Sequence, residues 1–264
     1  MPKGGAFICA ILFCIGSLFL IATGAAETSL RNQPEQAAIA NLHRTGAFAV
    51  AVLGVVLFLW LMLAGPRWSE VFAGSILAAG VADALLETSG AGAALHTLHA
   101  WIAALVTGAG LVLAWTLSPA FPRAPEIVVD HGWPSLRFVT SAAVVLLIVQ
   151  IELGAGYRHD VLGLIPHLLG APIVALVVML AASFVLQQFP AHGSLRPAAI
   201  TVLIVTSVQI AFGLITLVTG ITQTVLTRGS LIMRVGHVVN GSLTLGAMAA
   251  LAIEVRRKVV RAQQ

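Results

Sequence analysis

The chain has 264 residues, and only 9% of them are charged (14 Lys and Arg, 10 Asp and Glu). A soluble domain carries about 25% charged residues. A chain that is 59% hydrophobic therefore has too little polar surface to coat a water-soluble globule. This composition excludes soluble enzymes, nucleic-acid-binding domains and disordered proteins, and it predicts a chain that lies in a lipid bilayer. The net charge of +4 fits a membrane protein with basic cytoplasmic loops, so no nucleic-acid partner is expected.

Eight apolar stretches are long enough to cross a hydrocarbon core of about 30 Å. Each is expected to be a helix, because a helix satisfies its backbone hydrogen bonds within its own segment. In chain order the expected spans are 6–25, 42–64, 71–86, 95–117, 138–156, 167–189, 198–220 and 235–253. The first is longer than the apolar part of a typical signal peptide, so it is interpreted as a span. The expected fold class is an all-α integral membrane protein with eight transmembrane helices.

A proline-rich connection divides the eight spans into two sets of four. The expected organisation is an N-terminal half at 1–118, a cytoplasmic linker at 119–136 and a C-terminal half at 137–264. Gln150 and Gly154 in the fifth span are echoed by Gln209 and Gly213 in the seventh, and residues 23–25 in the first resemble a fainter copy. The chain is therefore expected to form two pseudo-repeated four-helix bundles.

The distribution of the 14 basic residues predicts that both termini are cytoplasmic. In that orientation the inner side holds Lys3, Arg67, Arg123, Arg137, Arg196, Arg256, Arg257, Lys258 and Arg261, and the outer side holds Arg31, Arg44, Arg158, Arg228 and Arg234. Because Lys and Arg accumulate in cytoplasmic loops, this excess on the inner side favours a multi-pass protein of the inner or plasma membrane.

Four of the eight histidines lie near the outer beginning of the even-numbered spans. They are His43, His96, His167 and His237, and they are expected at a similar depth because these four spans run in the same direction. A single one would be an ordinary interfacial imidazole. Two facing pairs in two helical bundles, however, are what axial ligation of a haem requires. Zinc is the weaker alternative, because no Cys, Asp or Glu lies close enough to complete a tetrahedral set.

His99 is the alternative to His96, since residues three apart share a helix face and only one of them can be the axial ligand. His96 is preferred because it lies nearer the start of its span and is followed four residues later by the small Ala100. Arg44 and Arg158 are candidates for pairing with haem propionates at the outer surface. The ordinary alternative for both is an arginine that extends to the membrane interface.

Three acidic residues inside the spans, Asp83, Glu87 and Glu152, are expected to face the protein interior or water, because a carboxylate in lipid is costly. Glu152 is a candidate for contact with a haem edge or a proton path. A hydrogen bond between helices is an equal alternative for this residue.

The segment QIELGAGYRH at 150–159 and the segment HRTGA beginning at His43 resemble the haem A synthase family. The likeness in architecture covers nearly the whole chain. It implies a resident haem b held by His167 and His237, and a second, substrate haem (haem O or A, or b) held by His43 and His96. The implied reaction oxidises a haem methyl group to a formyl group for respiratory oxidase assembly. The implied partners are an electron donor, haem O synthase or a respiratory complex.

The chain departs from this family three residues before His43, where the family has an acidic residue and this chain has Ala40. The cysteine pair of the outer loops is absent, and Leu168 replaces an arginine that often follows the third histidine. No catalytic residue is assigned beyond the candidates His43 and His96. A second hypothesis is therefore a non-catalytic b-type cytochrome with two histidine ligands per haem, which transfers electrons or is an accessory subunit of a larger complex. A third is a haem-free structural or transport protein.

Overall fold

The computed structural model describes residues 3–88, 92–119, 121, 126–223 and 225–261. Within these residues, eight helices are long and apolar enough to cross a membrane, so the all-α multi-pass fold is confirmed. The helices are α1 (Lys3–Ser29), α2 (Gln36–Ala64), α3 (Arg67–Thr88), α4 (Ala93–Leu117), α5 (Leu136–Arg158), α6 (Leu164–Gln188), α7 (Leu195–Thr222) and α8 (Arg228–Lys258).

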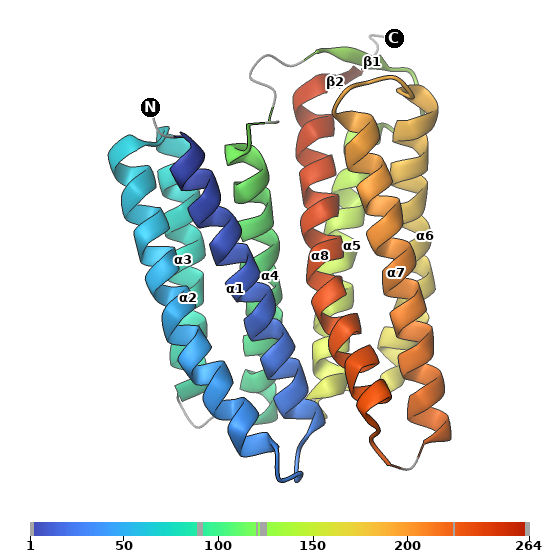
Figure 1. Cartoon of the computed structure of the whole chain (residues 1–264). Coiled ribbons are helices and arrows are strands. Elements are labelled where there is room, and N and C mark those ends of the chain that lie inside the picture. Colours follow the sequence, from blue (N-terminus) through green and yellow to red (C-terminus); the bar gives the residue numbers. More distant parts are fainter. Residues whose placement is uncertain (1–2, 89–91, 120, 122–125, 224, 262–264) are drawn as a thin grey trace.

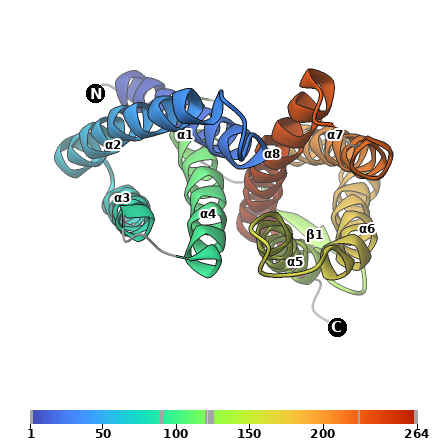
Figure 2. The same cartoon turned by 90° about the horizontal axis from the view of Figure 1, so that it is seen from below.

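The helices form two groups of four, α1–α4 and α5–α8, that lie side by side (Figures 1 and 2). Each group encloses its own apolar core. The first core includes Phe13, Leu57 and Leu113, and the second includes Val178 and Met248. The groups meet where α1 and α4 contact α8 and where α4 contacts α5. The connection between α4 and α5 therefore separates two apolar cores, which adjoin each other along α4 and α8.

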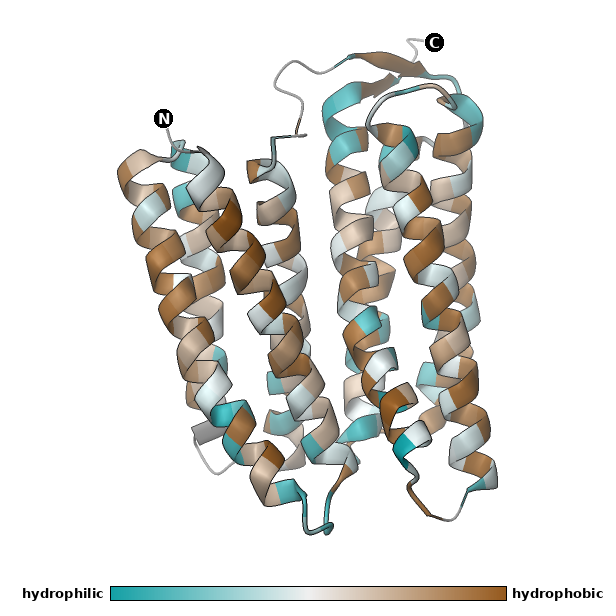
Figure 3. Cartoon of the chain, viewed as in Figure 1, coloured by the Kyte–Doolittle hydropathy of each residue, from teal (hydrophilic) through white to brown (hydrophobic). Residues whose placement is uncertain are grey.

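Apolar residues cover the helices along most of their length, and polar residues gather at the helix ends and connections (Figure 3). On α6, Ile173, Leu176 and Leu180 are 59%, 59% and 40% exposed. Their spacing of three and four residues places them on one face of the helix. A soluble protein rarely exposes so continuous an apolar face. In a bilayer the lipid chains cover it.

Side chains satisfy the backbone amides at the start of two helices. The buried Asp130 carboxylate accepts a hydrogen bond of 2.7 Å from the backbone N–H of Leu136 at the first turn of α5. At the start of α8, Thr227 and Ser230 form a capping box, in which each side chain accepts from the backbone N–H of the other residue. The first amides of a helix have no partner within the helix, so these bonds fix where α5 and α8 begin.

A short parallel strand pairing, which the sequence did not predict, joins the linker to the C-terminal segment. Strand β1 (Val128–Asp130) pairs with β2 (Val259–Arg261), with Val128 opposite Val259. The pairing lies at the same end of the molecule as the start of α1 (Figure 1). We call the opposite end of the helices, where the even-numbered helices begin, the distal end. Of the predicted linker, residue 120 and residues 122–125, including Arg123, lie outside the described residues.

Candidate functional site

Each half contains one pair of closely spaced histidine rings near the distal end. The ring centres of His43 on α2 and His99 on α4 are 6.2 Å apart, and those of His167 on α6 and His237 on α8 are also 6.2 Å apart. The ring planes are nearly perpendicular, at 81° and 88°. In both halves the pair joins the second and the fourth helix of the group.

This separation fits two axial ligands of one haem iron. An imidazole nitrogen binds a transition metal at about 2 Å and the ring centre lies about 1 Å further away, so two rings on opposite sides of one iron have centres about 6 Å apart. Among the residues that the structure describes, no group of three or more His, Cys, Asp or Glu is placed to hold a metal ion. The described side chains thus offer two ligands per site, and a planar macrocycle would supply the remaining four.

In the N-terminal half, both Nδ1 atoms face oxygen acceptors on the preceding helix. Thr23 Oγ1 on α1 lies 2.9 Å from Nδ1 of His43 and donates its own hydrogen to a backbone carbonyl of α1, 3.1 Å away. Asp83 Oδ1 on α3 lies 3.0 Å from Nδ1 of His99. A carboxylate only accepts hydrogen bonds, and the threonine hydrogen is already engaged. Both neighbours can accept a proton from Nδ1, which would leave the lone pair of Nε2 for a metal.

In the C-terminal half, glutamine amides occupy the corresponding places. The side-chain nitrogen of Gln150 on α5 lies 2.9 Å from Nδ1 of His167 and donates to the backbone carbonyl of His167 at 2.8 Å. The backbone carbonyl of Gln150 lies 3.2 Å from the same Nδ1. On α7, the side-chain nitrogen of Gln209 lies 3.2 Å from Nδ1 of His237, while its oxygen accepts from Asn240 at 3.0 Å. The Gln150 carbonyl can accept a proton from Nδ1 of His167, whereas the Gln209 amide nitrogen faces Nδ1 of His237 as a donor.

Three of the four rings pack against a glycine of the preceding helix. The pairs are Gly24 with His43, Gly154 with His167 and Gly213 with His237, and a Cβ atom on these glycines would lie 3.2, 2.9 and 3.0 Å from the ring Cε1. A larger residue would therefore displace the ring. In α5 and α7 the glutamine and the glycine are four residues apart, so the repeated Gln–Gly spacing places an amide and a gap on one helix face.

The ring that faces His43 is that of His99, the alternative to the preferred His96 in the sequence prediction. The second span was predicted to begin at residue 42, but α2 begins at Gln36, so His43 lies seven residues inside its helix. On α4, which begins at Ala93, the residue at a similar depth is His99, six residues in, and not His96, three residues in. The expected start of the second span, six residues later than the start of α2, is what favoured His96 in the sequence.

His96 instead lies beside His159, which follows the last residue of α5, and their ring centres are 6.0 Å apart. This contact joins the two halves. Burial and, next, the charge of the adjacent Arg158 lower the pKa of His159 from 6.5 to about 4, so its ring is neutral at pH 7. Arg31 and Asp160 form an exposed ion pair of 3.0 Å that also links the two halves.

The two arginines predicted to lie near a haem edge have different surroundings. Arg158 is half-buried, and its guanidinium donates to the backbone carbonyl of Ala25 and to Ser29 Oγ in the last turns of α1. It therefore lies between the halves at the distal end. Arg44 is exposed on α2, one residue after His43.

Ala40 is buried on α2, three residues before His43. Its position thus faces the interior of the N-terminal half and holds only a methyl group.

The three acidic residues predicted inside the spans differ in their surroundings. Asp83 is 7% exposed and faces the interior, as expected, and one carboxylate oxygen of Glu152 is buried. The side chain of Glu87 lies outside the described residues.

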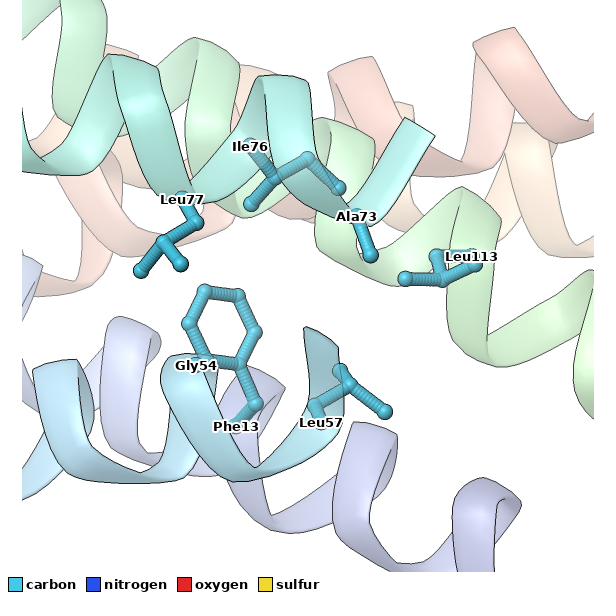
Figure 4. A pocket seen from close by; sticks show the side chains of 7 residues that line it. All are labelled: Phe13, Gly54, Leu57, Ala73, Ile76, Leu77 and Leu113. Atoms are coloured by element: carbon cyan, nitrogen blue, oxygen red, sulfur yellow. The ribbon is translucent and has the colours of Figure 1, made fainter. Parts of the chain in front are cut away.

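The N-terminal half also contains a small apolar pocket (Figure 4). It is lined by Phe13, Gly54, Leu57, Ala73, Ile76, Leu77 and Leu113. Phe13 precedes Thr23 by ten residues and Gly54 follows His43 by eleven, so the pocket is about 15 Å along the helices from the histidine pair. Its lining contributes no metal ligand, and it is separate from the histidine site.

Two residues beside the histidines were not connected with the site from the sequence. Asp83 was recognisable as a rare acid inside a span, but hydropathy did not reveal its contact with His99. Trp101, two residues after His99, donates from Nε1 to the backbone carbonyl of Ile148 at 3.1 Å. Since Ile148 lies two residues before Gln150, this hydrogen bond joins the helices that carry the two sites.

A search of protein-family models finds no match to the chain, and a search of curated proteins finds none either.

Proposed function

We propose that this membrane protein binds two haem groups, one in each half. His43 and His99 are the axial ligands in the N-terminal half, and His167 and His237 are the axial ligands in the C-terminal half. The observation that carries the proposal is the pair of imidazole rings separated by 6.2 Å in each half. An oxygen of the preceding helix lies within 3.2 Å of Nδ1 of His43, His99 and His167, as is usual for histidines that bind metals.

The groups around the rings support binding of a large planar cofactor. Gly24, Gly154 and Gly213 leave space for three of the rings, and the apolar helices provide walls of low polarity. Arg158 at the distal end has a guanidinium suited to a propionate carboxylate. When bound, haem supplies one-electron chemistry and oxygen activation, which the protein side chains themselves lack. We place both sites on the outer side of an inner or plasma membrane, with both termini in the cytoplasm.

The first candidate activity is that of a haem A synthase, which oxidises a methyl group of haem O to a formyl group. The resemblance of residues 150–159 and of the segment after His43 to that family supports it. In this reading the C-terminal half holds a resident haem b and the N-terminal half holds the substrate haem. The protein would then work with an electron donor and with haem O synthase.

The second candidate function is that of an electron-transferring b-type cytochrome or accessory subunit of a respiratory complex. The burial of Ala40 three residues before His43 favours it, because the family carries an acid at that position. A methyl group can neither accept nor donate a proton, so the catalytic apparatus implied by the resemblance is incomplete at this point.

Purification followed by a pyridine haemochrome assay tests the proposal. We expect about two b-type haems per chain in this assay and a low-spin absorption spectrum from the native protein. A colourless protein, obtained from cells with ample haem, would contradict the proposal. Coexpression with a haem O synthase and extraction of the haems then separates the two candidates. Accumulation of haem A, as with an active control enzyme, supports the first candidate, and unchanged haem O supports the second.

A further inference from the structure

Asp83 is an acidic side chain inside a membrane span and is only 7% exposed. A buried ionised carboxylate is unfavourable unless a specific partner offsets the cost of removing it from water. Its Oδ1 atom lies 3.0 Å from Nδ1 of His99. The carboxylate is thus aimed at the far nitrogen of a proposed haem ligand.

Among the contacts that the structure describes, the groups beside Nδ1 of the other three ligand rings are neutral. Thr23 places a hydroxyl at 2.9 Å from Nδ1 of His43. Gln150 and Gln209 place side-chain amides at 2.9 and 3.2 Å from Nδ1 of the two rings in the C-terminal half. The two sites therefore have the same spacing of ligands but a different charge behind them.

A carboxylate that accepts the Nδ1–H bond makes the imidazole a stronger electron donor through Nε2. The negative charge also stabilises the ferric form of a bound haem, which carries one more positive charge than the ferrous form. Both effects lower the reduction potential, and the low polarity of the surrounding helices strengthens them. A neutral amide at Nδ1 exerts neither effect to the same degree.

We propose that Asp83 is a positioning residue that gives the N-terminal haem the lower reduction potential of the two. This inference rests on the proposed function, because it requires haem at both histidine pairs. Asp83 acts through His99 and not on a substrate. With haem bound at both pairs, the C-terminal site would have the higher reduction potential and the N-terminal site would hold the stronger reductant.

A spectroelectrochemical titration of the purified protein with both haems tests this inference. We expect two midpoint potentials. In Asp83→Asn, which keeps the size of the side chain but removes its charge, the lower midpoint rises and the upper one does not move. His167→Ala removes the C-terminal haem, so the same substitution in that background assigns the lower midpoint to the N-terminal site. Asp83→Glu retains the charge and should restore a lower midpoint.

Gln209→Glu is the matched variant in the other half. It places a carboxylate at the amide position beside His237, so it should lower the upper midpoint. This variant also keeps the inference falsifiable if Asp83→Asn fails to fold. We further expect Asp83→Asn to weaken haem binding at the N-terminal site by about tenfold, as loss of a ligand's hydrogen-bond partner commonly does.

The outcomes separate the two proposals. Two bound haems with both midpoints unchanged in Asp83→Asn, or with only the upper midpoint moved, would overturn the role of Asp83 and leave haem binding intact. An unchanged upper midpoint in Gln209→Glu would also count against that role. A wild-type protein that binds no haem overturns the proposed function and this inference with it.

Discussion

In the N-terminal half the paired histidines contact a hydroxyl and a carboxylate, whereas in the C-terminal half they contact two amides. The ring centres are nevertheless 6.2 Å apart in both halves. The backbone of the four-helix group therefore sets the distance between the ligands, and single side chains on the odd helices set the charge behind them. One scaffold can thus hold two chemically different sites.

The halves also differ at the end that carries the chain termini. In the C-terminal half, Glu254 and Lys258 on α8 form a fully buried ion pair, and Ser194 at the start of α7 donates to Glu254 at 2.8 Å and accepts from Lys258. The strand pairing of β1 with β2 lies at the same end. Buried charges are tolerated when each has a partner and hydrogen bonds. This polar cluster therefore ties α7 to α8 in the C-terminal half.

The largest effect that we predict is the loss of one haem in His99→Ala. Removal of an axial ligand should reduce the haem content from about two per chain to about one, because His43 alone remains in that half. His96→Ala is the matched control, since it lies three residues away on the same helix and should keep both haems. The pyridine haemochrome assay measures both. Loss of one haem in His96→Ala but not in His99→Ala would identify His96 as the ligand.

Lys258→Met tests whether the buried ion pair of Glu254 and Lys258 stabilises the C-terminal half. It removes the fully buried charge partner of Glu254 and leaves Arg257, 3.4 Å away, as the remaining one, so we expect the free energy of unfolding to fall by about 1.5–3 kcal/mol. The double variant Glu254→Gln with Lys258→Met removes both charges and should regain much of this loss. Thermal unfolding in detergent compares the variants. A double variant as unstable as the single one would show that packing, not charge, dominates there.

The glycines beside the rings predict a smaller effect. In Gly154→Ala the new Cβ would lie 2.9 Å from Cε1 of His167, so the ring must shift and haem affinity in the C-terminal half should fall about tenfold. Gly163→Ala is the control, because its Cβ would meet no atom within 4 Å. Haem titration of the apoprotein measures the affinities. Equal affinities in the two variants would contradict the role of Gly154.

The smallest predicted effect concerns the contact between the halves. Burial and the charge of Arg158 lower the pKa of His159 from 6.5 to about 4, with further contributions from His96 and Arg31. The unfolded chain therefore binds a proton at this residue before the folded protein does. The contribution of the neutral ring is fully present above pH 6.5 and is lost as the pH falls toward 4.

Unfolding temperatures measured between pH 7 and pH 4 test this dependence. We expect the wild-type value to fall on acidification, and we expect His159→Gln to show a weaker fall because it cannot bind the proton. Equal pH profiles for the two proteins would show that other groups control the response to acid.

The sequence predicted the eight spans because the length of an apolar segment is set directly by the thickness of the bilayer. It predicted the starts of the spans less well. The first turns of α2, from Gln36, contain polar residues that continue the helix beyond the apolar core, and this displaced the expected depth of His43. Hydropathy measures apolar length and not helix length, so the choice between His96 and His99 required the structure.

The surroundings of the rings were predictable only in part. The repeated Gln and Gly of α5 and α7 are visible in the sequence, because two copies share one spacing. The contact of Asp83 with His99 has no such copy and depends on how α3 and α4 are rotated against each other. The pairing of Val128 with Val259 joins residues 131 positions apart and has no local signal in the sequence.

The haem content of the purified protein decides whether the two histidine pairs bind haem. We expect about two haems per chain for the wild type, about one after substitution of His99 or His237 alone, and none when both are replaced. A protein that contains no haem when haem is plentiful, or one that keeps two haems after both substitutions, would contradict the account.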